Sequence, residues 1–239
     1  MRQVLQHIGR KRSAFSQVPF FTYLLDKSTT PQERLSFAPA GAPFIMAFAD
    51  LNKHVLFENG PADDLQDLIN VHSREDATHF AMYLRDLETL GYDLPLSFTD
   101  ALEFLWSDRR KSLRTTCYKL AGLLEPSSTK LRIVIVEVIE ALGSAAFETF
   151  AQVASEFRSA TGKSLEYFGR PHEQLETGHT IGTDEIEERL HAVVLTEDER
   201  ARSVQMVDSI FDSFSAMMAE LHEYVLTTRP YPAAAGAAS

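Results

Sequence analysis

Two short stretches decide the fold that we expect for this chain: HSREDATH at residues 72–79 and HEQLETGH at residues 172–179. Both have the pattern His-x3-(Asp/Glu)-x2-His. On an α-helix, positions i, i+4 and i+7 lie within an arc of roughly 60° and span roughly 10 Å, because each residue adds about 100° of turn and 1.5 Å of rise. Each stretch therefore predicts two imidazoles and one carboxylate on the same side of a helix.

This arrangement is typical of a two-metal site in a helical bundle, where facing helices each contribute an acid-x-x-His pair and other helices add carboxylates. Asp76-x-x-His79 and Glu176-x-x-His179 have the form of these pairs. The alternative, two charged helix faces in contact with solvent, fits poorly with the apolar residues beside both stretches. The candidate metal ligands are therefore His72, Asp76, His79, His172, Glu176 and His179.

Such a site needs another carboxylate, and Glu140 is the best candidate. It lies among apolar residues in the stretch that we expect to be most buried, and a buried carboxylate is strongly disfavoured unless it is paired, hydrogen-bonded or bound to metal. Glu137, one turn earlier, is the competitor, although an exposed position suits it better. Mixed imidazole and carboxylate ligands favour iron or manganese, and Glu140 would bridge two ions about 3.5–4 Å apart.

Composition limits the class of protein. The chain has 239 residues, 44% of them hydrophobic, and a formal net charge of −11, which argues against a nucleic-acid or anionic-membrane partner. No apolar run reaches about 18 residues, and the first residues lack the apolar stretch of a signal peptide. A single cysteine, Cys117, excludes a disulfide framework. We expect a cytoplasmic protein with a small-molecule substrate, and a homodimer is our working hypothesis.

Apolar periodicity predicts a single all-α domain over residues 1–228, with about seven or eight helices, and a disordered low-complexity tail at 229–239. The β-branched run 131–136 would suit a strand, but the helical period continues through the following residues. Expected helices begin near Pro19, after Thr30 and near Pro171, and otherwise cover 44–57, 62–90 as one long helix, 97–107, 112–124, 129–160 and 184–227.

The run YFGRPHEQLETGH, residues 167–179, resembles the final metal-binding helix of the haem-oxygenase-like diiron oxidases and oxygenases. That family pairs the motif with an earlier histidine, matched here by His79, and with a bridging glutamate about thirty residues upstream, matched by Glu140. The resemblance covers roughly residues 40–225 and implies the haem-oxygenase-like fold. In one departure, His72 stands where the family usually has a glutamate. Either His72 is an unusual ligand, or Asp76 or Glu75 replaces the missing acid.

The resemblance implies a non-haem diiron enzyme that uses two iron ions, or manganese, with O2 as co-substrate and Glu140 at the reacting centre. Family members cleave C–C bonds of fatty acids or amino acids to give alkenes or nitriles, or oxygenate nitrogen. We favour an amino-acid-like substrate over a fatty-acid-like one, because Arg74, Arg85 and Arg170 lie near the candidate ligands and can meet a carboxylate. If these arginines are ordinary surface charges, they indicate nothing about the substrate.

Three alternatives remain open. A ferritin-like diiron carboxylate protein would use Asp50, Asp76 with His79, Glu140, and Glu176 with His179, but would leave His72 and His172 without a role. A metal-free hydrolase or cofactor-biosynthesis enzyme of the same bundle fold would use Cys117 as nucleophile, although no histidine adjoins it. A non-catalytic interaction protein has only the general helical surface in its favour.

Overall fold

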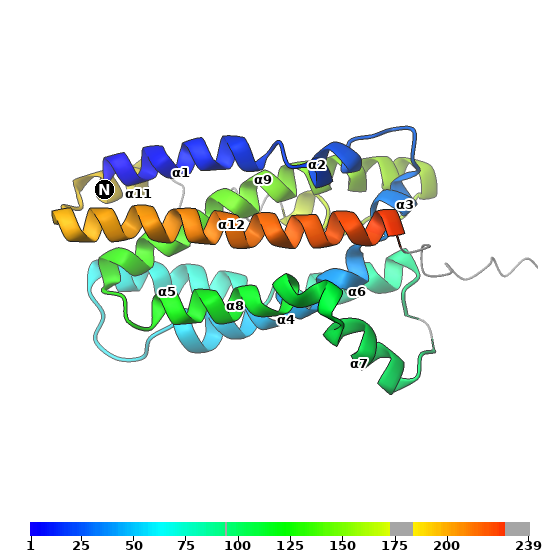
Figure 1. The fold of residues 1–239 in the computed structure, drawn as a ribbon, viewed down its shortest axis with the longest axis horizontal. Helices are drawn as coiled ribbons and strands as arrows, with labels where there is room; N and C mark the ends of the chain where they lie inside the picture. Colours follow the sequence, from blue (N-terminus) through cyan, green and yellow to red (C-terminus); the bar gives the residue numbers. More distant parts are fainter. Residues whose placement is uncertain (94, 173–183, 228–239) are drawn as a thin grey trace, which may run out of the picture.

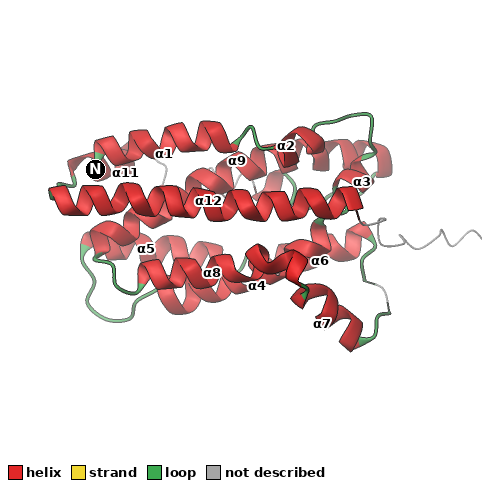
Figure 2. Ribbon diagram, viewed as in Figure 1, coloured by secondary structure: helices red, strands yellow, loops and turns green. Residues whose placement is uncertain are grey.

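In the computed structural model of the chain, residues 1–93, 95–172 and 184–227 are described, and within them every regular element is helical (Figures 1 and 2). The elements are α1 (Arg2–Phe15), α2 (Pro19–Leu24), α3 (Pro31–Arg34), the 3₁₀ helix η1 (Ala38–Gly41), α4 (Ala42–Leu51), the π-helix η2 (Asn52–Leu56), α5 (Asp64–Asp76), α6 (Phe80–Leu90), α7 (Phe98–Trp106), the 3₁₀ helix η3 (Asp108–Arg110), α8 (Lys111–Leu124), α9 (Thr129–Thr161), α11 (Asp184–Ala192) and α12 (Glu197–Thr227). The all-α prediction is confirmed, with more helices than the seven or eight expected.

The helices form a bundle around α9, which packs against α1, α5 and α12. α8 packs against α4 and α12, and α1 and then α2 lie beside α12 (Figure 1). The strand-like run 131–136 lies in the first turns of α9, and every residue of it is buried. A helix that is apolar on all sides belongs in a protein interior, so β-branched composition did not signal a strand here. None of the described helices is long and apolar enough to span a lipid bilayer.

The N-terminal helix α1 was missed by the sequence pattern. Its buried side chains, Val4, Ile8 and Phe15, are few and lie among basic residues. They nevertheless form a narrow stripe that packs on α9 and α12. Tertiary burial, rather than a strong local pattern, stabilises this helix.

The long helix predicted over 62–90 is wrong, because α5 ends at Asp76 and α6 begins at Phe80. Between them the chain makes tight turns in which His79 N–H donates to the Asp76 carbonyl at 3.2 Å. The Thr78 hydroxyl donates to the Glu75 carbonyl at 3.4 Å and so competes for a helical acceptor. His79 consequently lies at a junction between two helices. The predicted end at Gly91 is confirmed, with the left-handed φ of 86° that favours glycine at a helix end.

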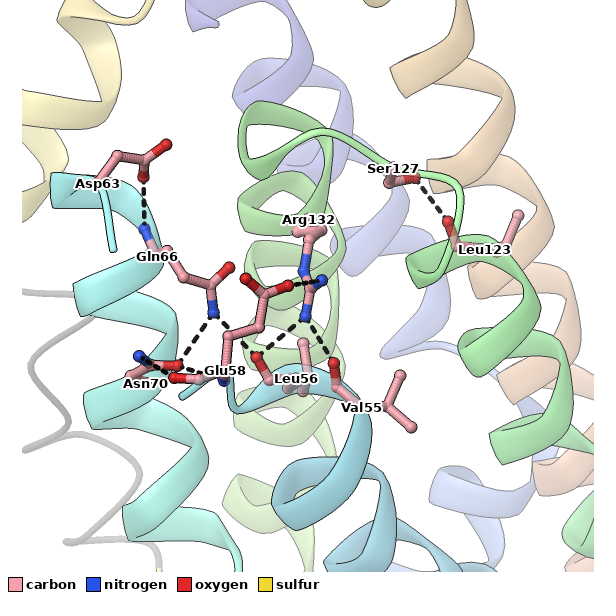
Figure 3. A network of polar contacts seen from close by, with 9 residues as sticks. All are labelled: Val55, Leu56, Glu58, Asp63, Gln66, Asn70, Leu123, Ser127 and Arg132. Atoms are coloured by element: carbon pink, nitrogen blue, oxygen red, sulfur yellow. Dashed lines mark hydrogen bonds and ion pairs between the residues drawn. The ribbon is translucent and has the colours of Figure 1, made fainter. Parts of the chain in front are cut away.

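A polar network joins η2 and the residues after it to both α5 and α9 (Figure 3). Arg132 of α9 is buried, pairs with Glu58, and donates to the carbonyls of Val55 at 2.5 Å and Leu56 at 3.0 Å. From α5, Gln66 donates to the same Leu56 carbonyl at 3.0 Å. Segment 55–58 therefore bonds to both helices, which fixes how α5 lies against α9. The candidate ligands of these two helices follow about two to three turns after Gln66 and Arg132.

Asn70 completes the α5 side of this network. Its side chain donates to the Glu58 carbonyl at 3.0 Å and accepts from the Glu58 N–H at 2.9 Å. Gln66 also donates to the Asn70 side-chain oxygen at 3.0 Å, which holds the amide in place. Buried polar groups that satisfy one another in this way specify one arrangement of the helices.

Candidate metal centre

One imidazole and two carboxylates from α5 and α9 meet inside the bundle. His72 Nε2 lies 3.2 Å from Asp76 Oδ2, and His72 Nδ1 lies 3.2 Å from Glu140 Oε1. One ligand atom from each of the three side chains lies within 4.8 Å of the others. His72 is fully buried, and the side chains of Asp76 and Glu140 are only 4% and 15% exposed. The structure therefore brings together three of the residues that the sequence predicted.

Two further histidines adjoin this cluster. His79 Nδ1 lies 3.5 Å from Asp76 Oδ1 and 2.9 Å from His172 Nε2. His172 is buried, and the Phe147 and Tyr167 rings pack on its imidazole at centroid distances of 4.0 and 4.6 Å. Five of the seven predicted ligands thus form one connected group, although His79 reaches it from a helix junction.

The other predicted ligands, Glu176 and His179, lie outside the described residues. Asp76 and Glu75 were the two acids proposed to replace the family's missing glutamate. Asp76 belongs to the cluster with His72 and Glu140, and Glu75 does not. Glu137 is partly buried on α9, so its expected exposed position is wrong. His72 contacts both carboxylates of the cluster, which supports its prediction as an unusual ligand.

A cavity of about 120 Å³ lies inside the bundle and reaches this group. Among the described residues, the polar ones that line it are Asp76, His79, Glu140, His172 and Tyr167. The rest of the described lining is apolar and includes nine phenylalanines: Phe15, Phe37, Phe44, Phe48, Phe80, Phe147, Phe150, Phe168 and Phe214. No lysine or arginine lines the cavity in the described part of the chain. The arrangement suits a polar reacting group beside a hydrocarbon surface.

The three arginines expected to bind a substrate carboxylate lie elsewhere. Arg74 is exposed, donates to the Asn70 carbonyl and stacks over the Phe57 ring. Arg85 forms a two-pronged ion pair with Glu166 at the surface. Arg170 is exposed and lines a separate surface hollow. The interpretation of these arginines as surface charges is therefore the better one.

Gly169 shapes the turn that carries His172. A Cβ at this buried position would lie 2.1 Å from the Leu165 carbonyl oxygen, closer than atoms can approach. We expect Gly169→Ala to displace the turn, to lower the free energy of unfolding by about 1–3 kcal/mol through strain, and to weaken metal binding at His172. Denaturant unfolding and metal titration measure the two effects.

The matched control is Gly122→Ala. Gly122 is an exposed position of α8, where an added Cβ meets nothing within 4 Å. Alanine there should stabilise the protein by about 0.5–1 kcal/mol, because glycine is unfavourable inside a helix. A Gly169→Ala protein as stable as this control would show that the turn tolerates the side chain.

Two residues of the alternative schemes are poorly placed for their roles. Asp50, the extra acid of the ferritin-like scheme, is exposed and does not line the cavity. Cys117 is 4% exposed, and burial raises the pKa of its thiol to about 12. At neutral pH this side chain is a thiol and a poor nucleophile.

We expect Cys117 to resist a water-soluble thiol reagent at pH 8 in the native protein and to react fully in denaturant. The pKa of the thiol in the folded protein exceeds the ordinary value of 9.0. Its contribution to the free energy of unfolding is therefore complete below pH 9 and is lost as the pH rises toward 12. Rapid labelling of the native protein would show that the thiol is accessible and would revive the nucleophile hypothesis.

The residues present fit divalent iron or manganese. Two carboxylates and up to three imidazoles supply the oxygen and nitrogen donors that these ions accept, and no thiolate belongs to the group. His172 has a defined tautomer for this purpose. Its Nδ1 lies 3.0 Å from the Tyr167 carbonyl, which can only accept, so Nε2 keeps the lone pair of the neutral ring.

The described residues thus form an all-α bundle in which a buried group of imidazoles and carboxylates lies beside an apolar cavity. No protein-family model matches the chain, and no curated protein matches its sequence. Among solved structures, it is similar to a domain of unknown function with a heme oxygenase-like fold from Shewanella denitrificans OS217. The sequence identity is 16%, the TM-score is 0.66, and the match covers 97% of this chain and 96% of that one. The predicted haem-oxygenase-like fold is confirmed, and at this identity the likeness shows the fold alone.

Proposed function

We propose that this protein is a non-haem diiron, O2-dependent oxidase or oxygenase that acts on a substrate with an apolar chain. The observation that carries the proposal is the placement of His72, Asp76 and Glu140, with His79 and His172 beside them, next to an apolar cavity inside the bundle. Iron bound by these side chains would supply the electrons that reduce O2. The protein would supply the charge balance, the orientation and the dry surroundings.

Each part of the site has a physical task in this scheme. Asp76 and Glu140 would offset part of the positive charge of two divalent cations, and their burial strengthens that attraction. The Tyr167 carbonyl fixes the orientation of the His172 ring. The phenyl rings around the cavity exclude water, which protects a reactive centre from side reactions.

The cavity lining favours a fatty-acid-like substrate over the amino-acid-like one. A zwitterionic or short polar substrate would lose its hydration without meeting a described lysine or arginine in the lining, whereas an alkyl chain gains about 0.8 kcal/mol for each CH2 group that it buries. C–C cleavage that gives an alkene is the reaction class that suits such a substrate. N-oxygenation would instead require a nitrogen-bearing one.

Anaerobic loading with Fe(II) tests the metal centre. We expect about two iron ions per chain and, on exposure to O2, a new absorption band. If neither is seen, the oxidase hypothesis is wrong. His172→Ala separates the ferritin-like alternative, which predicts little loss of iron, from this proposal, which predicts the loss of one ion.

Ala146 offers a test of the substrate class, because it lines the cavity from α9. We expect Ala146→Phe to weaken binding of a fatty acid at least tenfold, since the new ring occupies the space for an alkyl chain, while iron per chain is unchanged. Overpacking should cost about 1–3 kcal/mol of stability. Calorimetric titration measures the ligand affinity.

The matched control is Ala160→Phe, an exposed position near the end of the same helix. It should leave the fatty-acid affinity unchanged. A screen of the iron-loaded protein under O2 complements the pair: fatty acids, rather than amino acids, should accelerate decay of the absorption band. Acceleration by amino acids alone would show that the substrate class is wrong.

A further inference from the structure

Helix α6 carries a buried carboxylate at Asp86, seven positions after His79. Asp86 is only 1% exposed. Its Oδ1 accepts the backbone N–H of Glu166 at 2.6 Å, and its Oδ2 accepts that of Phe168 at 2.9 Å. Burial raises the pKa of Asp86, and these N–H bonds act in the opposite direction by stabilising the charged form. The carboxylate thus holds a loop that is eighty positions away in the sequence.

The loop held by Asp86 contacts His172 at two points. The Tyr167 carbonyl, between the two bonded N–H groups, accepts from His172 Nδ1 at 3.0 Å. The Glu166 carbonyl accepts the backbone N–H of His172 at 3.2 Å. Any rotation of the 166–168 backbone would therefore move the acceptor that defines the tautomer of the His172 ring.

The opposite side of that ring is also fixed from α6. His172 Nε2 lies 2.9 Å from Nδ1 of His79, which directly precedes the first residue of α6. In the metal-free protein, with Nδ1 of His172 protonated, Nε2 accepts from His79 Nδ1–H, and the same lone pair would bind the metal in place of this bond. One helix therefore positions both faces of the imidazole, through His79 directly and through Asp86 by way of the loop.

We propose that Asp86 is a positioning residue for the metal centre: by binding the N–H groups of Glu166 and Phe168, it fixes the Tyr167 carbonyl and so the orientation and tautomer of His172. The inference rests on the proposed function only in taking His172 Nε2 as a metal ligand. Outer partners of this kind typically change metal affinity by about 10–100-fold.

The loop has a second attachment that serves as a control. Glu166 pairs through its side chain with Arg85 at 2.7 Å, and both side chains are about half exposed. Glu166→Gln removes this surface ion pair but keeps the backbone N–H that Asp86 binds. If the loop needed only some attachment, Glu166→Gln and Asp86→Ala would affect His172 equally. If Asp86 positions His172 as proposed, only Asp86→Ala affects it.

The test is nuclear magnetic resonance of metal-free, ¹⁵N-histidine-labelled protein, with the His172 signals assigned from their absence in His172→Gln. We expect wild-type protein and Glu166→Gln to show one tautomer with Nδ1 protonated. Asp86→Ala should show a mixture of tautomers. Asp86→Asn, which keeps one acceptor oxygen, should be intermediate. Mn(II) titration should give affinities about 10–100-fold weaker for Asp86→Ala and unchanged for Glu166→Gln.

A folded Asp86→Ala protein with the wild-type His172 signals would overturn the inference, even if its stability were lower. If that variant does not fold, Asp86→Asn decides in the same way. If wild-type protein binds no metal, the proposed function is wrong, and the ring signals of the metal-free protein still decide the role of Asp86.

Discussion

Glu140→Gln is expected to reduce iron from two ions per chain to one at most, and to weaken the binding that remains by more than about 100-fold. This effect is larger than that of removing a residue that only supports a ligand. The change keeps the size of the side chain and one oxygen donor. It removes the charge that lies 3.2 Å from His72 Nδ1 and that would offset the cations. Iron analysis after anaerobic loading and gel filtration gives the stoichiometry.

The control is Glu148→Gln, eight positions further along α9. Its side chain is 66% exposed, and its nearest cationic partner is Arg12 at 3.8 Å. Iron binding should be unchanged, because an exposed, solvent-screened charge contributes little. Equal iron content in the two variants would show that the His72–Asp76–Glu140 cluster does not hold the metal.

Arg132→Met is expected to lower the free energy of unfolding by about 2–4 kcal/mol, because the Val55 carbonyl loses its donor, the Leu56 carbonyl keeps only the bond from Gln66, and Glu58 loses its cationic partner. Methionine keeps most of the volume and the apolar stem. We also expect metal affinity to fall at least tenfold, since segment 55–58 no longer holds α5 against α9. Denaturant unfolding and Mn(II) titration measure the two changes.

Arg34→Met provides a comparison of similar burial. Arg34 is 1% exposed, donates to the Leu24 carbonyl at 2.7 Å and pairs with Glu156. Its loss should destabilise the protein to a similar extent without changing metal affinity, because neither partner belongs to α5. Equal metal affinities in the two variants would mean that Arg132 contributes to stability alone.

Local patterns predicted the parts of the fold that depend on a single helix. α9 was predicted through its β-branched start because the apolar period continues over the following turns, and Glu140 was selected from its apolar neighbours. The motif also placed His72 and Asp76 on one helix face, where the structure has them. In these cases the spacing alone determines the geometry.

The remaining features depend on contacts between distant segments. The break before His79 involves a hydroxyl–carbonyl bond and tight turns that apolar spacing does not encode. Asp86 resembles an ordinary polar residue of an amphipathic helix, and only the loop eighty positions away reveals its partners. The arginines were misjudged because nearness in sequence to a ligand says nothing about the direction of a side chain.

The junction at 77–79 divides the donor atoms between two separately held pieces. His72, Asp76 and Glu140 move with α5 and α9, whereas His79 and His172 follow α6 and its attached loop. Substitutions along α6 should therefore act first on His79 and His172, and reach the other group through the 3.5 Å contact between His79 Nδ1 and Asp76 Oδ1. In a single continuous helix, the same substitutions would shift His72, Asp76 and His79 together.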